Sequence, residues 1–147
     1  MPAHVTVLYP FVEPAQVDDH IIATLAAVFG LCGRFRLPLL ADAVVRSRRA
    51  VARPRTPPGP FIDLTAAAWE AFPHHPPYGG AHDHVVPHLT IAERSLSAVK
   101  TAEQAVQTGL PLSTHIEGVL LIVGTQAPNS WRVLHEFRLR AARSETP

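Results

Sequence analysis

Cysteine is almost absent from this sequence, with Cys32 as the single example among 147 residues. One cysteine cannot form a disulfide within the chain, and a chain without disulfides fits a reducing compartment. No apolar run approaches the roughly 18 residues that span a bilayer, and no signal-peptide pattern opens the sequence. We therefore expect a cytoplasmic protein with no membrane partner.

Excess charge is also lacking, since the formal net charge is +1. A protein that follows duplex nucleic acid needs a basic face, so we expect no duplex DNA partner. A small anionic ligand stays compatible with this balance. Lys100 is the only lysine and the other basic residues are arginines, whose planar side chains suit bidentate contacts with phosphate.

The length and composition favour one globular domain over residues 1–147, with 47% hydrophobic residues and 15 prolines. Helical periodicity predicts helices over residues 13–31, 61–72 and 96–108. Alternating patterns predict strands over residues 5–11, 35–40, 43–54, 85–92 and 110–116, and a hairpin from 119–124 and 131–139. Together they describe two repeats, at about 1–55 and about 61–140. A strand and a helix precede the corresponding part of the second repeat, so we expect that a leading strand and helix are missing from the first.

Two His-x-Thr tripeptides stand at matching places in these repeats: the first motif, His4-Val5-Thr6, and the second motif, His88-Leu89-Thr90. Residues i and i+2 of a strand point to the same face, so each imidazole lies beside a hydroxyl group. Two such strands facing one cleft supply a general base, a general acid and two hydroxyl donors, which suffices for phosphoryl transfer without a metal. The alternative is two histidines on unrelated strands and ordinary β-favouring threonines.

Four further side chains are candidates for substrate binding. Tyr9, Phe11 and Tyr78 flank the motifs and could stack on a nucleobase, although core or turn packing explains them equally well. Arg48 lies in an arginine-rich strand and could attract phosphate, but a solvated strand face is the more common outcome.

A histidine cluster precedes the second motif and consists of His74, His75, His82, Asp83 and His84. Two histidines at His-x-His spacing can share a metal ion, so a metal-dependent hydrolase is one alternative. No cysteine joins the cluster, and the sequence has no His-Glu-x-x-His helix. We favour a solvated loop, or weak adventitious zinc binding, over a specific metal site, and we expect no cofactor.

The paired motifs and their surroundings resemble the 2H phosphoesterases, and within them the bacterial 2′-5′ RNA ligase-like branch. The resemblance rests on residues 2–11, 77–80 and 85–92 and on Trp131-Arg132-Val133. It implies an α+β fold of two lobes related by a pseudo-twofold axis, each with an antiparallel-rich sheet, helices outside and a central cleft. It also implies that His4 and His88 transfer protons while Thr6 and Thr90 hydrogen-bond phosphate oxygens.

The expected reaction acts on a small cyclic nucleotide or an RNA end, by 2′,3′-cyclic phosphate hydrolysis or 2′-5′ linkage chemistry. Water attacks the phosphorus in line, one neutral imidazole takes its proton, and the opposite charged imidazole protonates the departing ribose oxygen. Such a pair predicts a bell-shaped pH profile. A non-catalytic nucleotide- or RNA-end-binding module is the other alternative. The sequence leaves the oligomeric state and the assignment of acid and base open.

Overall fold

The protein is described here by a computed structural model that covers residues 4–46, 49–54, 59–81, 87–93, 101, 112–125, 127 and 130–141. Residues 39–46, 49–54, 90–93 and 112 are described by their backbone only. The fold is α+β, with antiparallel sheets in two lobes, as the sequence predicted. One lobe holds a four-stranded sheet in the order β3-β2-β1-β4, and the other holds the two-stranded sheet β5-β6.

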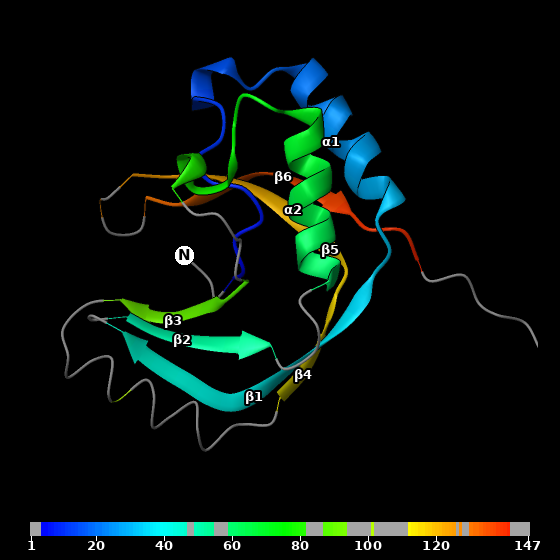
Figure 1. The fold of residues 1–147 in the computed structure, drawn as a ribbon. Coiled ribbons are helices and arrows are strands. Elements are labelled where there is room, and N and C mark those ends of the chain that lie inside the picture. The colour runs from blue at the N-terminus through cyan, green and yellow to red at the C-terminus, as the bar shows by residue number, and fades with distance from the viewer. Residues whose placement is uncertain are drawn as a thin grey trace, which may run out of the picture.

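The helices and strands occur along the chain in the following order. They are η1 (Pro14–Gln16), α1 (Asp19–Leu31), β1 (Phe35–Arg46), β2 (Arg49–Pro54), α2 (Gly59–Ala71), η2 (Pro77–Gly80), β3 (Leu89–Glu93), β4 (Leu112–Ile116), β5 (Gly118–Val123) and β6 (Arg132–Arg138). In Figure 1 the helices and β5-β6 lie above, the four-stranded sheet lies below, and the N-terminal segment descends between them to β3.

Helix α1 begins later than the sequence pattern predicted. The carboxylate of Asp18 accepts a hydrogen bond from the Ile21 amide at 2.9 Å, so Asp18 is the N-cap and the helix starts at Asp19. Residues Pro14–Gln16 form a separate 3-10 turn. The predicted start at Glu13 is therefore wrong, because the Asp18 side chain satisfies one of the free amides in the first turn of the helix.

The first long strand also differs from its prediction. The sequence suggested a break after Leu40, but β1 continues to Arg46, which pairs with Arg49 of β2. The register shifts between Leu39 and Ala43, so the feature that looked like a strand end is an irregularity within one strand. The single strand predicted over 43–54 is therefore wrong, because these residues belong to both β1 and β2, and residues 47 and 48 lie outside the described residues.

Other elements lie close to their predicted ranges. Helix α2, strand β4 and the β5-β6 hairpin are confirmed, whereas the predicted helix over 96–108 lies outside the described residues except for Thr101. At the end of the hairpin, a Cβ added to Gly124 would clash with the Trp131 ring. The Ser130 hydroxyl donates to the Thr125 carbonyl at 2.8 Å and closes the turn.

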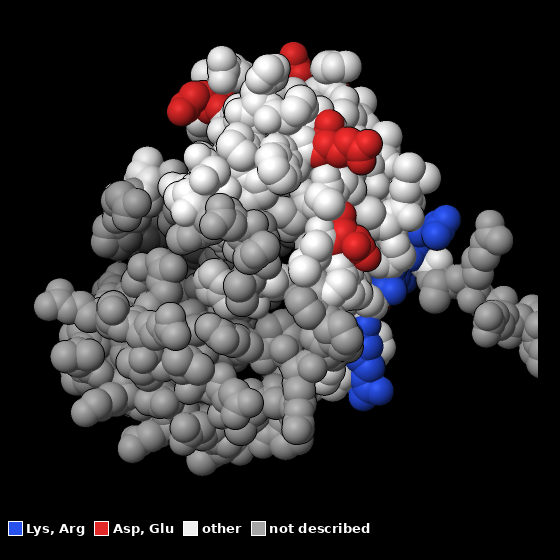
Figure 2. Space-filling model, viewed as in Figure 1, with Lys and Arg blue, Asp and Glu red and all other residues white. Residues whose placement is uncertain are grey.

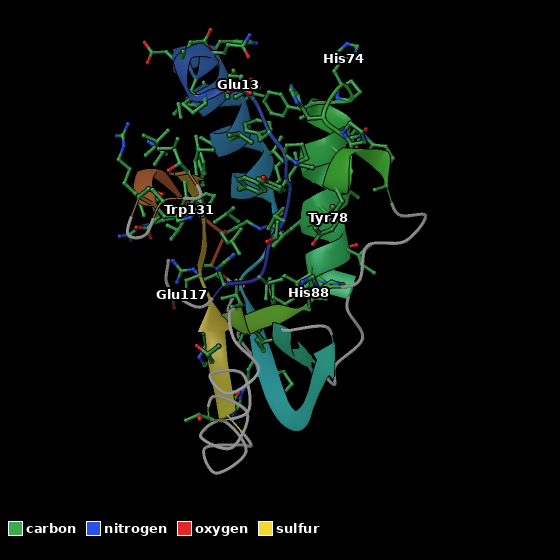
Figure 3. The ribbon with its side chains drawn as sticks, turned by 90° about the vertical axis from the view of Figure 1, so that its left-hand side faces the viewer. Glu13, His74, Tyr78, His88, Glu117 and Trp131 are labelled. Atoms are coloured by element: carbon green, nitrogen blue, oxygen red, sulfur yellow. The ribbon has the colours of Figure 1, made fainter. Side chains whose placement is uncertain are left out.

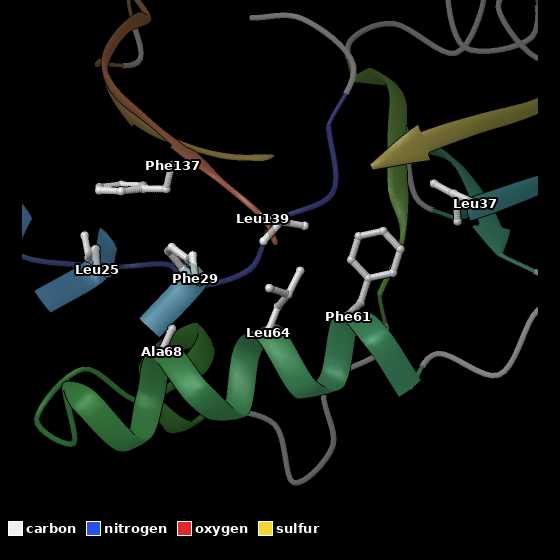
Figure 4. Packing of buried hydrophobic residues seen from close by; sticks show 8 residues of the cluster. All are labelled: Leu25, Phe29, Leu37, Phe61, Leu64, Ala68, Phe137 and Leu139. Atoms are coloured by element: carbon white, nitrogen blue, oxygen red, sulfur yellow. The ribbon is translucent and has the colours of Figure 1, made fainter. Parts of the chain in front are cut away.

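The hydrophobic core joins both helices to the two sheets. Figure 4 shows its buried residues, which are Leu25, Phe29, Leu37, Phe61, Leu64, Ala68, Phe137 and Leu139. Phe61 on α2 meets Phe35 on β1 edge to face, with ring centroids 4.9 Å apart. Helix α2 thus has one face fixed by packing, and that face lies beside the N-terminal segment. Within the described part of the chain, no helix has the length and apolarity needed to cross a bilayer.

Candidate active site

The first motif does not lie in a regular strand. The predicted strand over 5–11 is wrong: Val5 forms an isolated antiparallel bridge with Leu89, and the chain bends at Val7 and Leu8. The side chains of Val5, Val7, Leu8 and Phe11 all pack against the core. Successive apolar side chains that pack against one core break the strict alternation of a strand. The segment therefore does not continue as a paired strand beyond Val5.

The bridge between Val5 and Leu89 joins the middle residues of the two motifs. Antiparallel pairing at these residues sets His4 opposite the backbone of Thr90, and Thr6 opposite His88. Val5 and Leu89 both pack against the core. Neighbouring residues of an extended chain point to opposite faces, so we expect the residues on either side of Val5 and Leu89 to face away from the core.

Burial at the paired motifs is intermediate. His4, Thr6 and His88 are each partly exposed, so a ligand can reach them while the surrounding chain still restricts them. Figure 3 shows His88 at the start of β3, at the level where the N-terminal segment meets the sheet. The structure describes Thr90 by its backbone alone, as the partner of Val51 in β2.

The second motif is held by a sheet. Strand β3 pairs with β2 through Leu89 opposite Ala52 and Thr90 opposite Val51, and β2 pairs in turn with β1. Pro87 is buried directly before His88, and its ring fixes the backbone φ angle there. The ladder and the proline together set the direction in which the second motif enters the site.

The first motif is held by side-chain and loop contacts instead. The Thr65 hydroxyl of α2 donates a hydrogen bond to the Val7 carbonyl at 2.9 Å. The Tyr78 amide of η2 donates to the Tyr9 carbonyl at 2.6 Å. These two bonds and the Val5 bridge fix the segment at three points along five residues.

Tyr78 has an unusual backbone conformation. Its φ angle is +53°, and Gly79 and Gly80 follow at +63° and +77°. Glycine adopts this left-handed region freely, whereas a residue with a Cβ does so at a cost of about 1–2 kcal/mol. Strain of this kind gathers at functional sites when the surroundings maintain it, and here it accompanies the bond to the first-motif segment.

The aromatic candidates differ in their surroundings. Tyr9 is 56% exposed beside the first motif, which leaves most of its side chain open to a ligand. Phe11 packs edge to face with Phe72 at 5.0 Å and contacts the His75 ring at 5.4 Å, so packing partners surround its ring. The stacking roles of Tyr9, Phe11 and Tyr78 stay predictions.

Comparison with known proteins identifies the family of this chain. The family model described as 2′-5′ RNA ligase superfamily matches residues 1–127. The chain belongs to the 2′-5′ RNA ligase superfamily. This match confirms the family that the two His-x-Thr motifs indicated.

A solved structure similar to this superfamily member is the crystal structure of TT0787 of Thermus thermophilus. The two chains are 19% identical, with a TM-score of 0.63 over 95% of this chain and 79% of that chain. At this identity the similarity shows the fold. No curated protein matches the chain.

The remaining candidates of this superfamily member are placed only in part. Arg48 lies outside the described residues, as do His82, Asp83 and His84. His74 is exposed, and His75 is half-buried against Phe11. Among the residues that the structure describes, no group of three His, Cys, Asp or Glu side chains is arranged to hold a metal ion. The metal interpretation thus gains no support from the described part of the loop.

Cys32 offers no activated nucleophile. Burial raises the pKa of its thiol, the carboxylate of Asp63 raises it further, and Arg140 opposes both effects. The thiol therefore stays protonated at neutral pH, whereas a reactive cysteine needs a lowered pKa.

Sequence reasoning missed Thr65. The residue lies between apolar positions of α2 and is 4% exposed, so a polar residue within an apolar helix face was the available signal. Its partner, the Val7 carbonyl, is separated from it by 58 residues. No local pattern relates two groups so far apart in the sequence.

Proposed function

We propose that this protein is a metal-independent phosphoesterase that opens cyclic phosphodiesters of nucleotides or RNA ends through its two His-x-Thr motifs. The observation that carries the proposal is the antiparallel bridge between Val5 and Leu89. It sets two motifs that are 84 positions apart in the sequence next to each other, and membership of the 2′-5′ RNA ligase superfamily supports the same chemistry.

In the proposed reaction, a water molecule attacks the phosphorus of a 2′,3′-cyclic phosphate opposite the ribose oxygen that leaves. One neutral imidazole, from His4 or His88, removes the proton of the water. The other imidazole, in its charged form, gives a proton to the departing oxygen, so that a phosphate monoester and a free hydroxyl result. Each proton-transfer role is worth about 10²–10⁴-fold in rate.

The threonines of the motifs are proposed to stabilise the charge of the transition state. Hydroxyl groups held beside the phosphoryl oxygens before the reaction begins need no reorganisation as charge develops. Thr6 is partly exposed next to His4, and Thr90 is proposed for the same task from β3. Tyr9 is proposed to stack on the base of the substrate, because its exposed ring lies just beyond the first motif.

The surface favours a short substrate. In the view of Figure 2 the described surface is mostly uncharged, with acidic side chains over the helices and arginines at one flank. A long nucleic acid needs many phosphate contacts in a row, and the described part of this face offers no such row. A single nucleotide or the end of an RNA strand needs only the site itself.

Hydrolysis of 2′,3′-cyclic AMP in the presence of EDTA tests the proposal, with His4→Ala and His88→Ala beside the wild type. We expect activity in the wild type and a loss of about 10²–10⁴-fold in kcat for each variant. The matched control is His115→Ala, an exposed histidine on β4, which should retain wild-type activity. Activity that disappears with EDTA alone would instead favour a metal-dependent hydrolase.

A non-catalytic binding module is the second candidate function. It is favoured by the first motif, which has an isolated bridge where the second motif has a ladder. Calorimetric titration with the products 2′-AMP and 3′-AMP separates the two. Binding that requires His4 and His88, without turnover of the cyclic nucleotide or of an RNA end with a 2′,3′-cyclic phosphate, would select the binding module.

A further inference from the structure

The position of the first motif depends on a small number of contacts. Val7 directly follows Thr6, and its carbonyl accepts the 2.9 Å hydrogen bond from Thr65. On either side of it, the segment is held by the bridge at Val5 and by the bond from the Tyr78 amide to the Tyr9 carbonyl. Val7 lies midway between these two contacts, so the Thr65 bond supports the stretch between them.

Thr65 is unusual among the described residues. It is 4% exposed, and no other polar or charged side chain of the described part is buried. A threonine inside a helix ordinarily bonds the carbonyl of its own preceding turn. The Thr65 hydroxyl instead donates to a carbonyl 58 positions away in the sequence.

Helix α2 gives this hydroxyl a fixed origin. Phe61, Leu64 and Ala68 are buried on the same helix at 6%, 2% and 1% exposure, and Figure 4 shows them along its core face. Close packing restricts the movement of such a helix. A hydrogen bond from Thr65 therefore ties Val7, and with it the adjacent Thr6, to the rigid core.

We propose that Thr65 is a positioning residue that holds the first motif, His4-Val5-Thr6, in register with the second motif. The proposal rests on the proposed function for its catalytic consequence. Thr65 lies on the core side of the segment, so it acts through the Val7 backbone. A displacement on the order of 1 Å in a reacting group can reduce the rate about 10²-fold, which is why one buried hydrogen bond matters here.

The test compares Thr65→Val, which keeps the shape and removes the hydroxyl, with Thr65→Ser, which keeps the hydroxyl and removes the methyl group. Thr24→Val is the matched control, because the Thr24 hydroxyl bonds the His20 carbonyl of its own helix at 2.8 Å. We measure kcat and KM for 2′,3′-cyclic AMP, and amide hydrogen exchange at residues 5–9. If Thr65→Val does not fold, Thr65→Ala against Thr65→Ser supplies the same comparison.

We expect Thr65→Val to lower kcat by about 10–100-fold with little change in KM, and to speed amide exchange at residues 5–9 by at least about tenfold through local opening. Thr65→Ser should recover most of both effects, and Thr24→Val should show neither. Wild-type exchange in Thr65→Val, or equal damage in Thr65→Val and Thr65→Ser, would overturn the positioning role. An inactive wild type would refute the proposed function, and the exchange measurement would still decide the role of Thr65.

Discussion

The two motifs have the same pattern of residue types but are held in place by different contacts. Leu89 and Thr90 of the second motif lie in β3, and a backbone ladder joins them to β2 and through β2 to the rest of the four-stranded sheet. The first motif has the isolated bridge at Val5, and its flanks are bound to α2 and η2. A sheet fixes a strand by many similar backbone bonds that form together. The first motif depends on a few dissimilar contacts, each of which matters.

The largest difference should appear when proline replaces the middle residue of each motif. Leu89→Pro removes a backbone donor inside β3 and should destabilise the protein by up to about 3 kcal/mol. Val5→Pro acts at a single bridge, so its effect on the free energy of unfolding should be clearly smaller. Both should abolish most of the hydrolysis of 2′,3′-cyclic AMP.

Urea unfolding followed by circular dichroism measures these two free energies, and the activity assay accompanies it. Equal destabilisation by the two prolines would show that the first motif is held as firmly as the second. The contrast between ladder and isolated bridge would then have no energetic meaning.

A smaller effect is expected at the aromatic contact that ends the first-motif segment. Phe11→Leu keeps an apolar side chain but loses the edge-to-face contact with Phe72 at 5.0 Å. We expect a loss of about 1.5 kcal/mol in the free energy of unfolding and faster amide exchange at residues 7–9 and 11, with exchange in β3 unchanged. Equal acceleration of exchange in β3 would indicate that the two motifs open together.

The smallest effect should follow removal of the cap of α1. Asp18→Ala loses the hydrogen bond to the Ile21 amide at 2.9 Å, which should cost about 1 kcal/mol. Because this cap lies outside the contacts that hold either motif, the melting temperature should fall while kcat is retained. Asp18→Asn, which keeps a side-chain oxygen for the cap, serves as the control. A fall in kcat with Asp18→Ala would show that α1 also helps to position the first motif.

Much of the fold could be predicted from local patterns. Helix α2 follows from its apolar spacing, and the β5-β6 hairpin follows from two apolar runs separated by a polar turn, closed by Thr125 and Ser130. The start of α1 could not be placed correctly, since Pro14 and Asp18 are both acceptable beginnings of a helix. The irregularity between Leu39 and Ala43 looked like a strand end, because it interrupts the alternating pattern of the strand.

In the candidate site, too, local patterns predict some features and not others. The residue types of the two motifs and their family follow from the sequence, because the chemistry of His and Thr and their spacing are local properties. The contact of Val5 with Leu89 and the hydrogen bond from Thr65 to Val7 depend on the folded chain. A hydrogen bond between distant segments exists only after the core has packed. The apolar face of α2 specifies that packing, but the sequence does not name the carbonyl that Thr65 will reach.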